Sequence, residues 1–140
     1  FRIATAANML GHSVLVPGST AYPDSNGSIS GAIDIPAASG NTNIVYRSEA
    51  GEILHTQELG GQSAGLVGFS WQNIPDEVLN QNASIKVEAY ADTGKGLKSV
   101  GASVYSEVLA ASTGNTTSDI VYDVRGYGDV KASDVVRFKN

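Results

Sequence analysis

Apolar and polar residues alternate along most of this chain, which is the pattern of β-strands with one buried face. The clearest case lies in residues 83–91, where Ile85 and Val87 alternate with Lys86 and Glu88. No segment of the sequence keeps the 3.6-residue period of an amphipathic helix. The pattern therefore predicts an all-β protein.

Turn-forming residues divide the chain into short strands at the spacing typical of a sandwich or barrel. Besides 83–91, strands are predicted at residues 11–16, 28–35, 44–46, 53–59, 67–71, 100–108, 120–124 and 130–138. Residues 19–27 are predicted to be a loop, 73–82 to be irregular, and 92–96 and 112–115 to be turns. Residues 1–9 are predicted to be a tail or the end of a helix.

The strands fall into a central group and two flanking groups. Residues 28–92 are enough for a small sandwich, and the flanks at 10–18 and 97–138 hold the other strands. This partition fits one domain inserted into another. The two chain crossings, near residues 18–27 and 92–97, are candidate hinges.

Composition narrows the classes of function. The chain has 140 residues, a formal net charge of −5 and no cysteine. The acidic charge argues against nucleic-acid binding, and the absence of cysteine excludes a disulfide scaffold. No apolar run is long enough to span a membrane. Because the chain begins at Phe1, not Met, we expect further sequence upstream.

One motif suggests catalysis. Residues 61–65, Gly-Gln-Ser-Ala-Gly, match the G-x-S-x-G pattern that exposes a nucleophilic serine on a strand-to-helix turn. Here a predicted strand follows Ser63, so we interpret the segment as a connection between two antiparallel strands. The two histidines, His12 and His55, lie far apart in the sequence, and the aspartates do not follow the spacing of a calcium loop. We predict no catalytic residue, cofactor or metal.

Trp71 is the only tryptophan. It shares a predicted strand face with Val67 and Phe69, so we expect it in a hydrophobic core. The alternative is an exposed aromatic platform for sugar, which would suit a carbohydrate-binding or adhesive extracellular module.

Three stretches in order resemble one protein family. They are Leu10-Gly11-His12-Ser13-Val14-Leu15-Val16-Pro17-Gly18, then Gly51-Glu52-Ile53-Leu54-His55-Thr56 with Leu59-Gly60, Ala64-Gly65 and Phe69-Ser70-Trp71, then Gly126-Tyr127-Gly128-Asp129-Val130 with Ser133-Asp134-Val135. Together they resemble the C-terminal region of bacterial flagellar hook-capping proteins, also called basal-body rod modification proteins. After Trp71 the family usually has an Asp/Gly-rich loop, and this chain has a different sequence there.

The resemblance implies a fold. The expected architecture is a fibronectin-III-like β-sandwich, residues 21–95, inserted into a Tudor-like small β-barrel made of residues 10–20 and 96–140. An aromatic cage for methylated ligands is not carried over, because the tyrosines are scattered.

The resemblance also implies a role as a non-enzymatic scaffold at the tip of the growing hook, outside the cell, after export by the flagellar type III apparatus. The implied partners are hook protein subunits and further copies of the chain in a cap ring, with no nucleic acid and no membrane insertion. As contact residues we predict Tyr22, Arg125 and Tyr127, which lie in the predicted loop and turn segments.

Overall fold

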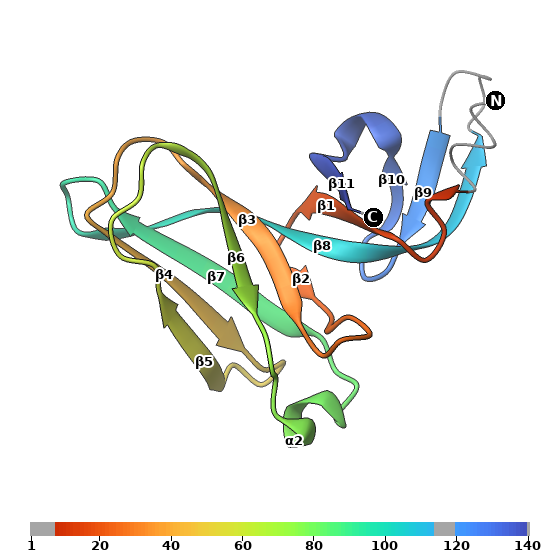
Figure 1. Ribbon diagram of the computed structural model, residues 1–140, viewed down its shortest axis with the longest axis horizontal. Coiled ribbons are helices and arrows are strands. Elements are labelled where there is room, and N and C mark those ends of the chain that lie inside the picture. Colours follow the sequence, from red (N-terminus) through yellow and green to blue (C-terminus); the bar gives the residue numbers. More distant parts are fainter. Residues whose placement is uncertain (1–7, 114–119, 140) are drawn as a thin grey trace.

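The computed structural model describes residues 8–113 and 120–139. Every pair of neighbouring strands in these residues is antiparallel, which confirms the all-β prediction (Figure 1). The elements are β1 (Ser13–Pro17), β2 (Thr20–Ala21), β3 (Ile29–Ile35), β4 (Asn41–Arg47), β5 (Ile53–Glu58), β6 (Gly65–Trp71), α2 (Asp76–Leu79), β7 (Ile85–Asp92), β8 (Leu97–Thr113), β9 (Ile120–Val124), β10 (Gly128–Lys131), the 3₁₀ turn η1 (Ala132–Asp134) and β11 (Arg137–Lys139).

One half of the molecule is a sandwich of two sheets. The first sheet has the order β5-β4-β7, and β7 also pairs with β2 and with the first residues of β8. The second sheet places β3 between β6 and the middle of β8. The alternating apolar residues of these strands turn inward, so that Ile33, Ile44 and Val87 are fully buried between the sheets.

Trp71 belongs to this core. Its side chain is only 5 % exposed, and its ring centroid lies 4.8 Å from that of Tyr46. The core prediction for Trp71 is therefore confirmed. An aromatic platform for sugar requires the opposite, an indole open to solvent.

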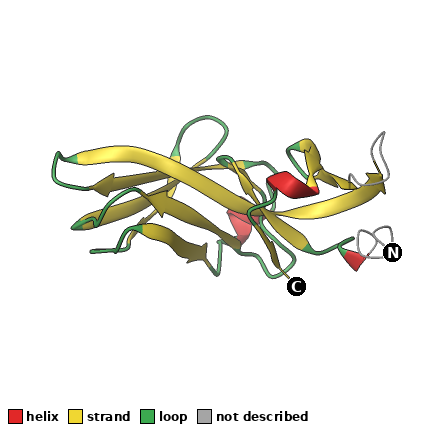
Figure 2. Cartoon of the chain, turned by 90° about the horizontal axis from the view of Figure 1, so that it is seen from above, coloured by secondary structure: helices red, strands yellow, loops and turns green. Residues whose placement is uncertain are grey.

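The other half has a second, separate core. Its strands follow the order β10-β9-β8-β1-β11. Val14, Val108, Tyr122 and Val124 are buried here, and η1 lies next to β9. In Figure 1 this half lies at the end opposite β4 and β5, and the two halves give the molecule an elongated shape that Figure 2 shows from above.

Strand β8 runs through both halves (Figures 1 and 2). It is 17 residues long and changes partner along its length. Leu97–Val100 pair with β7, Gly101–Val104 with β3, Ser103–Glu107 with β1, and Val108–Thr113 with β9. The β3 and β1 pairings overlap at Ser103 and Val104, so the hydrogen-bonded ladder is continuous from one half to the other.

The structure corrects several details of the predicted elements. The segment 19–27 is not entirely a loop, because Thr20 and Ala21 pair with β7. The irregular segment 73–82 contains the single turn α2. The turn predicted at 112–115 is wrong for its first two residues, which still belong to β8, and its other two lie outside the described residues. The tail or helix end predicted at 1–9 also lies mostly outside them.

Candidate functional site

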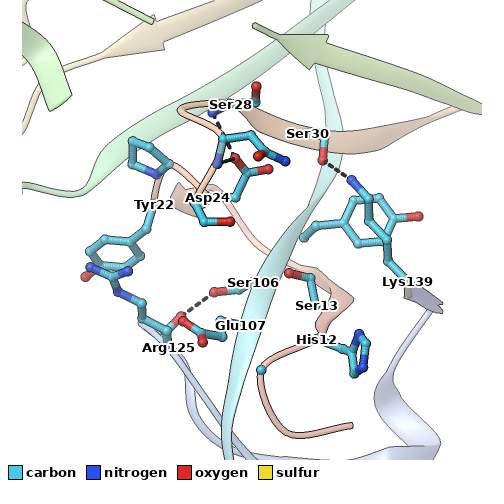
Figure 3. Close-up of a pocket in the computed structure, with 15 residues that line it drawn as sticks. His12, Ser13, Tyr22, Asp24, Ser28, Ser30, Ser106, Glu107, Arg125 and Lys139 are labelled. Atoms are coloured by element: carbon cyan, nitrogen blue, oxygen red, sulfur yellow. Dashed lines mark hydrogen bonds between the residues drawn. The ribbon is translucent and has the colours of Figure 1, made fainter. Parts of the chain in front are cut away.

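A cleft of about 560 Å³ lies between the two halves, along the part of β8 where the pairing with β3 has ended and the pairing with β9 has not begun (Figure 3). Its walls come from five segments of the chain. These segments are residues 11–13, residues 22–30 with Tyr22, Asp24 and Ser30, residues 105–107 of β8, Arg125 after β9, and Lys139 on β11.

Two of the predicted contact residues, Tyr22 and Arg125, meet at one wall of the cleft. The guanidinium carbon of Arg125 lies 4.4 Å from the centre of the Tyr22 ring, within the range of a cation–π contact. Arg125 is exposed and Tyr22 half-buried. The contact therefore holds a positive charge at a defined position facing the cleft.

Tyr127, the third predicted contact residue, lies beside this wall and turns toward the junction. Its hydroxyl donates to the carbonyl oxygen of Thr20 and accepts a hydrogen bond of 3.0 Å from the amide of the same residue. Burial raises the pKa of the Tyr127 hydroxyl above its ordinary value, although the backbone hydrogen bond at Thr20 acts in the opposite direction. The hydroxyl therefore remains a donor at neutral pH.

The opposite wall carries a second cation. The ammonium of Lys139 lies 5.0 Å from the centre of the Tyr105 ring and 3.3 Å from the hydroxyl oxygen of Ser30. Figure 3 shows Lys139 and Arg125 on different sides of β8. Each cation is thus held over a tyrosine ring.

Two carboxylates, those of Asp24 and Glu107, also line the cleft. One oxygen of Asp24 accepts hydrogen bonds from the amides of Asn26 and Ser28, at 2.9 and 3.0 Å, which orders the loop that forms the wall. Charges of both signs and several hydroxyl groups therefore line the cleft. In the described residues, no group of three or more His, Cys, Asp or Glu side chains is arranged to hold a metal.

Ser63 has no nucleophile geometry. It is exposed, it lies between the isolated bridge Ser39–Gln62 and strand β6, and no helix follows it. His55 stacks on Trp71, and His12 lines the cleft between the halves. The segment does connect two strands, β5 and β6, but the prediction that these form an antiparallel pair is wrong, because β5 pairs with β4 and β6 pairs with β3 in the other sheet.

Sequence reasoning missed two side chains of the cleft, Tyr105 and Lys139. Neither residue stands in a sequence pattern that predicts a contact role. Lys139 faces Ser30 across 109 positions of sequence, so no local pattern connects them.

Among the described helices, none is long and apolar enough to cross a membrane.

Two β cores joined by one long strand, with a polar cleft between them, define the class of protein as an all-β module. Residues 18–95, more than half of the chain, match the family described as the FlgD Ig-like domain. The chain therefore belongs to the FlgD Ig-like domain family.

Solved structures share the fold over nearly the whole chain. FlgD from Xanthomonas campestris is 22 % identical, with 99 % of this chain and 100 % of that chain covered at a TM-score of 0.74. FlgD from P. aeruginosa is 18 % identical, with 94 % and 98 % covered at a TM-score of 0.73. No curated protein matches the chain significantly.

Proposed function

We propose that this chain is the part of a flagellar hook-capping protein that stands at the tip of the growing hook and promotes polymerisation of exported hook subunits. The observation that carries the proposal is family membership over residues 18–95, together with the fold shared with the Xanthomonas campestris protein. That protein is described in terms of hook capping essential for flagellar assembly.

The test is deletion of the gene that encodes this chain, followed by electron microscopy of the cell surface. Loss of hooks, restored by the full gene on a plasmid, is the expected result. Hooks of normal number and length in the deletion strain would refute the proposal.

We infer a finer architecture, in which a fibronectin-III-like sandwich at residues 21–95 is inserted into a Tudor-like barrel of residues 10–20 and 96–140. The order β5-β4-β7 opposite β6-β3 supports the first part, because these strands form the two facing sheets of an Ig-type sandwich, to which Leu97–Val104 of β8 add a strand from outside the bounds 21–95. The separate core around Val14 and Tyr122 supports the second part. Hydrogen exchange of the whole chain tests the partition, since two cores should give two groups of protected amides that open separately.

We propose that the partners are hook subunits and neighbouring copies of the chain in a cap ring, outside the cell after type III export. Within this chain we place the contact at the cleft wall formed by Tyr22 and Arg125, with Tyr127 behind it. Support comes from the exposure of Arg125 and from its fixed position over Tyr22. Arginine and tyrosine are also, with tryptophan, enriched among the residues that contribute most to binding at protein interfaces.

A further inference from the structure

The turn after β9 and the segment around β2 interlock through two tyrosine–glycine contacts. The Tyr127 ring covers Gly18, where an added Cβ would lie 2.5 Å from the ring carbon Cε1. The Tyr22 ring covers Gly126, where an added Cβ would lie 2.7 Å from Cε2. Each segment therefore supplies one ring and one glycine, and neither glycine site has room for a side chain.

The Tyr127 hydroxyl adds two hydrogen bonds to this contact. It bonds both backbone groups of Thr20, which stands between Gly18 and Tyr22 in the sequence. Gly126 has a φ of +84°, a conformation that favours glycine. The turn at Gly126 lets Arg125 and Tyr127, on either side of it, both contact the segment from Thr20 to Tyr22. The side chain of Tyr127 also packs against both cores.

A second contact joins the halves at the other wall of the cleft. Lys139, at the end of β11, reaches Ser30 at the start of β3 with 3.3 Å between the ammonium and the hydroxyl oxygen. Between the two contacts, β8 carries a continuous ladder from β3 to β1. A single β-strand can twist about its own axis. Contacts on different sides of that strand oppose such a twist.

From this arrangement we infer that Gly18, Thr20, Tyr22, Gly126 and Tyr127 form an interlock that fixes the angle between the two halves. The crossing at residues 18–27, a hinge candidate from sequence, is then the place where the two halves are held. The inference is independent of hook capping, since it concerns only this chain. Its consequence is a cleft of constant shape that presents Arg125 and Lys139 at a fixed separation.

The experiment is a distance measurement between two spin labels by pulsed electron resonance. Because the chain contains no cysteine, Thr56→Cys on β5 and Lys131→Cys on β10 give two unique attachment sites, both exposed and both in strands. A single narrow distance peak is expected for the chain with an intact interlock.

Two substitutions then weaken the interlock. Tyr127→Phe keeps the ring and removes the bonds to Thr20, and Gly126→Ala displaces the Tyr22 ring. The expected result is loss of the single narrow peak in Gly126→Ala and a wider peak in Tyr127→Phe, with circular dichroism unchanged in the latter. Tyr90→Phe, on the outer face of the sandwich, is the matched control and should keep the narrow peak.

Two outcomes would overturn the inference. One is a broad or multiple distribution in the intact chain, which would mean that the halves already move. The other is an unchanged narrow peak in folded Tyr127→Phe and Gly126→Ala, which would mean that β8 alone sets the angle.

Discussion

The imidazole of His55 is stacked on the indole of Trp71, with ring centroids 4.7 Å apart and planes inclined by 13°. Tyr46 packs on the same indole, so Trp71 is enclosed by aromatic rings in the sandwich core. Such ring pairs contribute about 0.5–1.5 kcal/mol beyond the area that they bury. His55, which is half-buried on edge strand β5, therefore lies between the Trp71 indole and solvent.

Replacing His55 with alanine should open the Trp71 indole to solvent. Trp71 fluorescence is expected to be blue-shifted and resistant to acrylamide in the parent chain, and red-shifted and more easily quenched in His55→Ala. Stability should fall by about 1 kcal/mol in urea unfolding. His12→Ala serves as the control, because His12 is the other histidine of the chain and lies in the cleft wall, away from Trp71. Equal quenching of Trp71 in all three proteins would contradict the stacked arrangement.

Buried tyrosines should make the protein sensitive to alkali. Burial raises the pKa values of Tyr46 and Tyr122 above the ordinary value for tyrosine. The native state then retains protons that the unfolded state loses, so stability falls as the pH rises above about 10. Each such tyrosine adds up to about 1.4 kcal/mol per pH unit to this slope. Urea unfolding at pH 8 to 11 measures the effect.

Tyr46→Phe tests the assignment of that slope. The Tyr46 hydroxyl donates to the Gln57 side chain at 2.6 Å, and Gln57 in turn donates to the carbonyl oxygen of Ser70 at 2.8 Å. The substitution should therefore cost about 1 kcal/mol at neutral pH and also reduce the alkaline slope. Because burial also raises the pKa of Tyr127, part of the slope should remain in the Tyr46→Phe, Tyr122→Phe double variant. A slope as steep as that of the parent chain would show that other groups cause the alkaline loss.

Gly31 should be intolerant of any side chain. It lies on β3 between Phe69 of β6 and Val104 of β8, and an added Cβ would collide with the Ser103 carbonyl oxygen and lie 2.6 Å from the Phe69 ring. Since a backbone atom cannot move aside cheaply, Gly31→Ala should destabilise by about 1–3 kcal/mol or more.

Gly68→Ala is the matched control for this substitution. Gly68 is also in a strand of the same sheet, but its nearest neighbour, the Gly31 carbonyl oxygen, would lie 3.9 Å from the new Cβ. Thermal unfolding of the two variants compares them directly. Similar melting temperatures for both would contradict the close packing of β3 against β8.

Local pattern was sufficient for the sandwich strands because their burial is periodic. Ile85 and Val87 alternate with exposed or half-buried residues, and β7 keeps the same two sheet faces throughout. Strand β8 was underestimated because its partners change from β7 to β9 along its length, so no single alternation describes it. Strand β2 was missed because it has only two residues, and its pairing with β7 is long-range.

The candidate site was less predictable than the strands, because its contacts join residues that are far apart in the sequence. Tyr22, Arg125 and Tyr127 stand in segments with the composition of loops and turns, and in the structure they lie around the same junction. What they touch could not be read from the sequence, since Thr20 and Tyr127 are 107 positions apart. Gly126 appeared only as a turn residue, and its second role, accommodating the Tyr22 ring, depends on a contact between distant segments.

Arg125→Ala is the sharpest test of the cleft as a partner contact. Arg125 is exposed and its side chain contacts the Tyr22 ring, so the fold should tolerate alanine with a change of about 1 kcal/mol or less. If the cleft wall binds a partner, the full-length protein carrying this substitution should be expressed and exported normally but restore fewer or shorter hooks in the deletion strain. Swimming in soft agar and hook counts measure the loss. Lys95→Ala, an exposed cation in the β7–β8 turn, is the charge-matched control. Hook numbers equal to wild type in Arg125→Ala would remove this residue from the partner interface, whereas a defect equal in both variants would point to net charge rather than to the cleft.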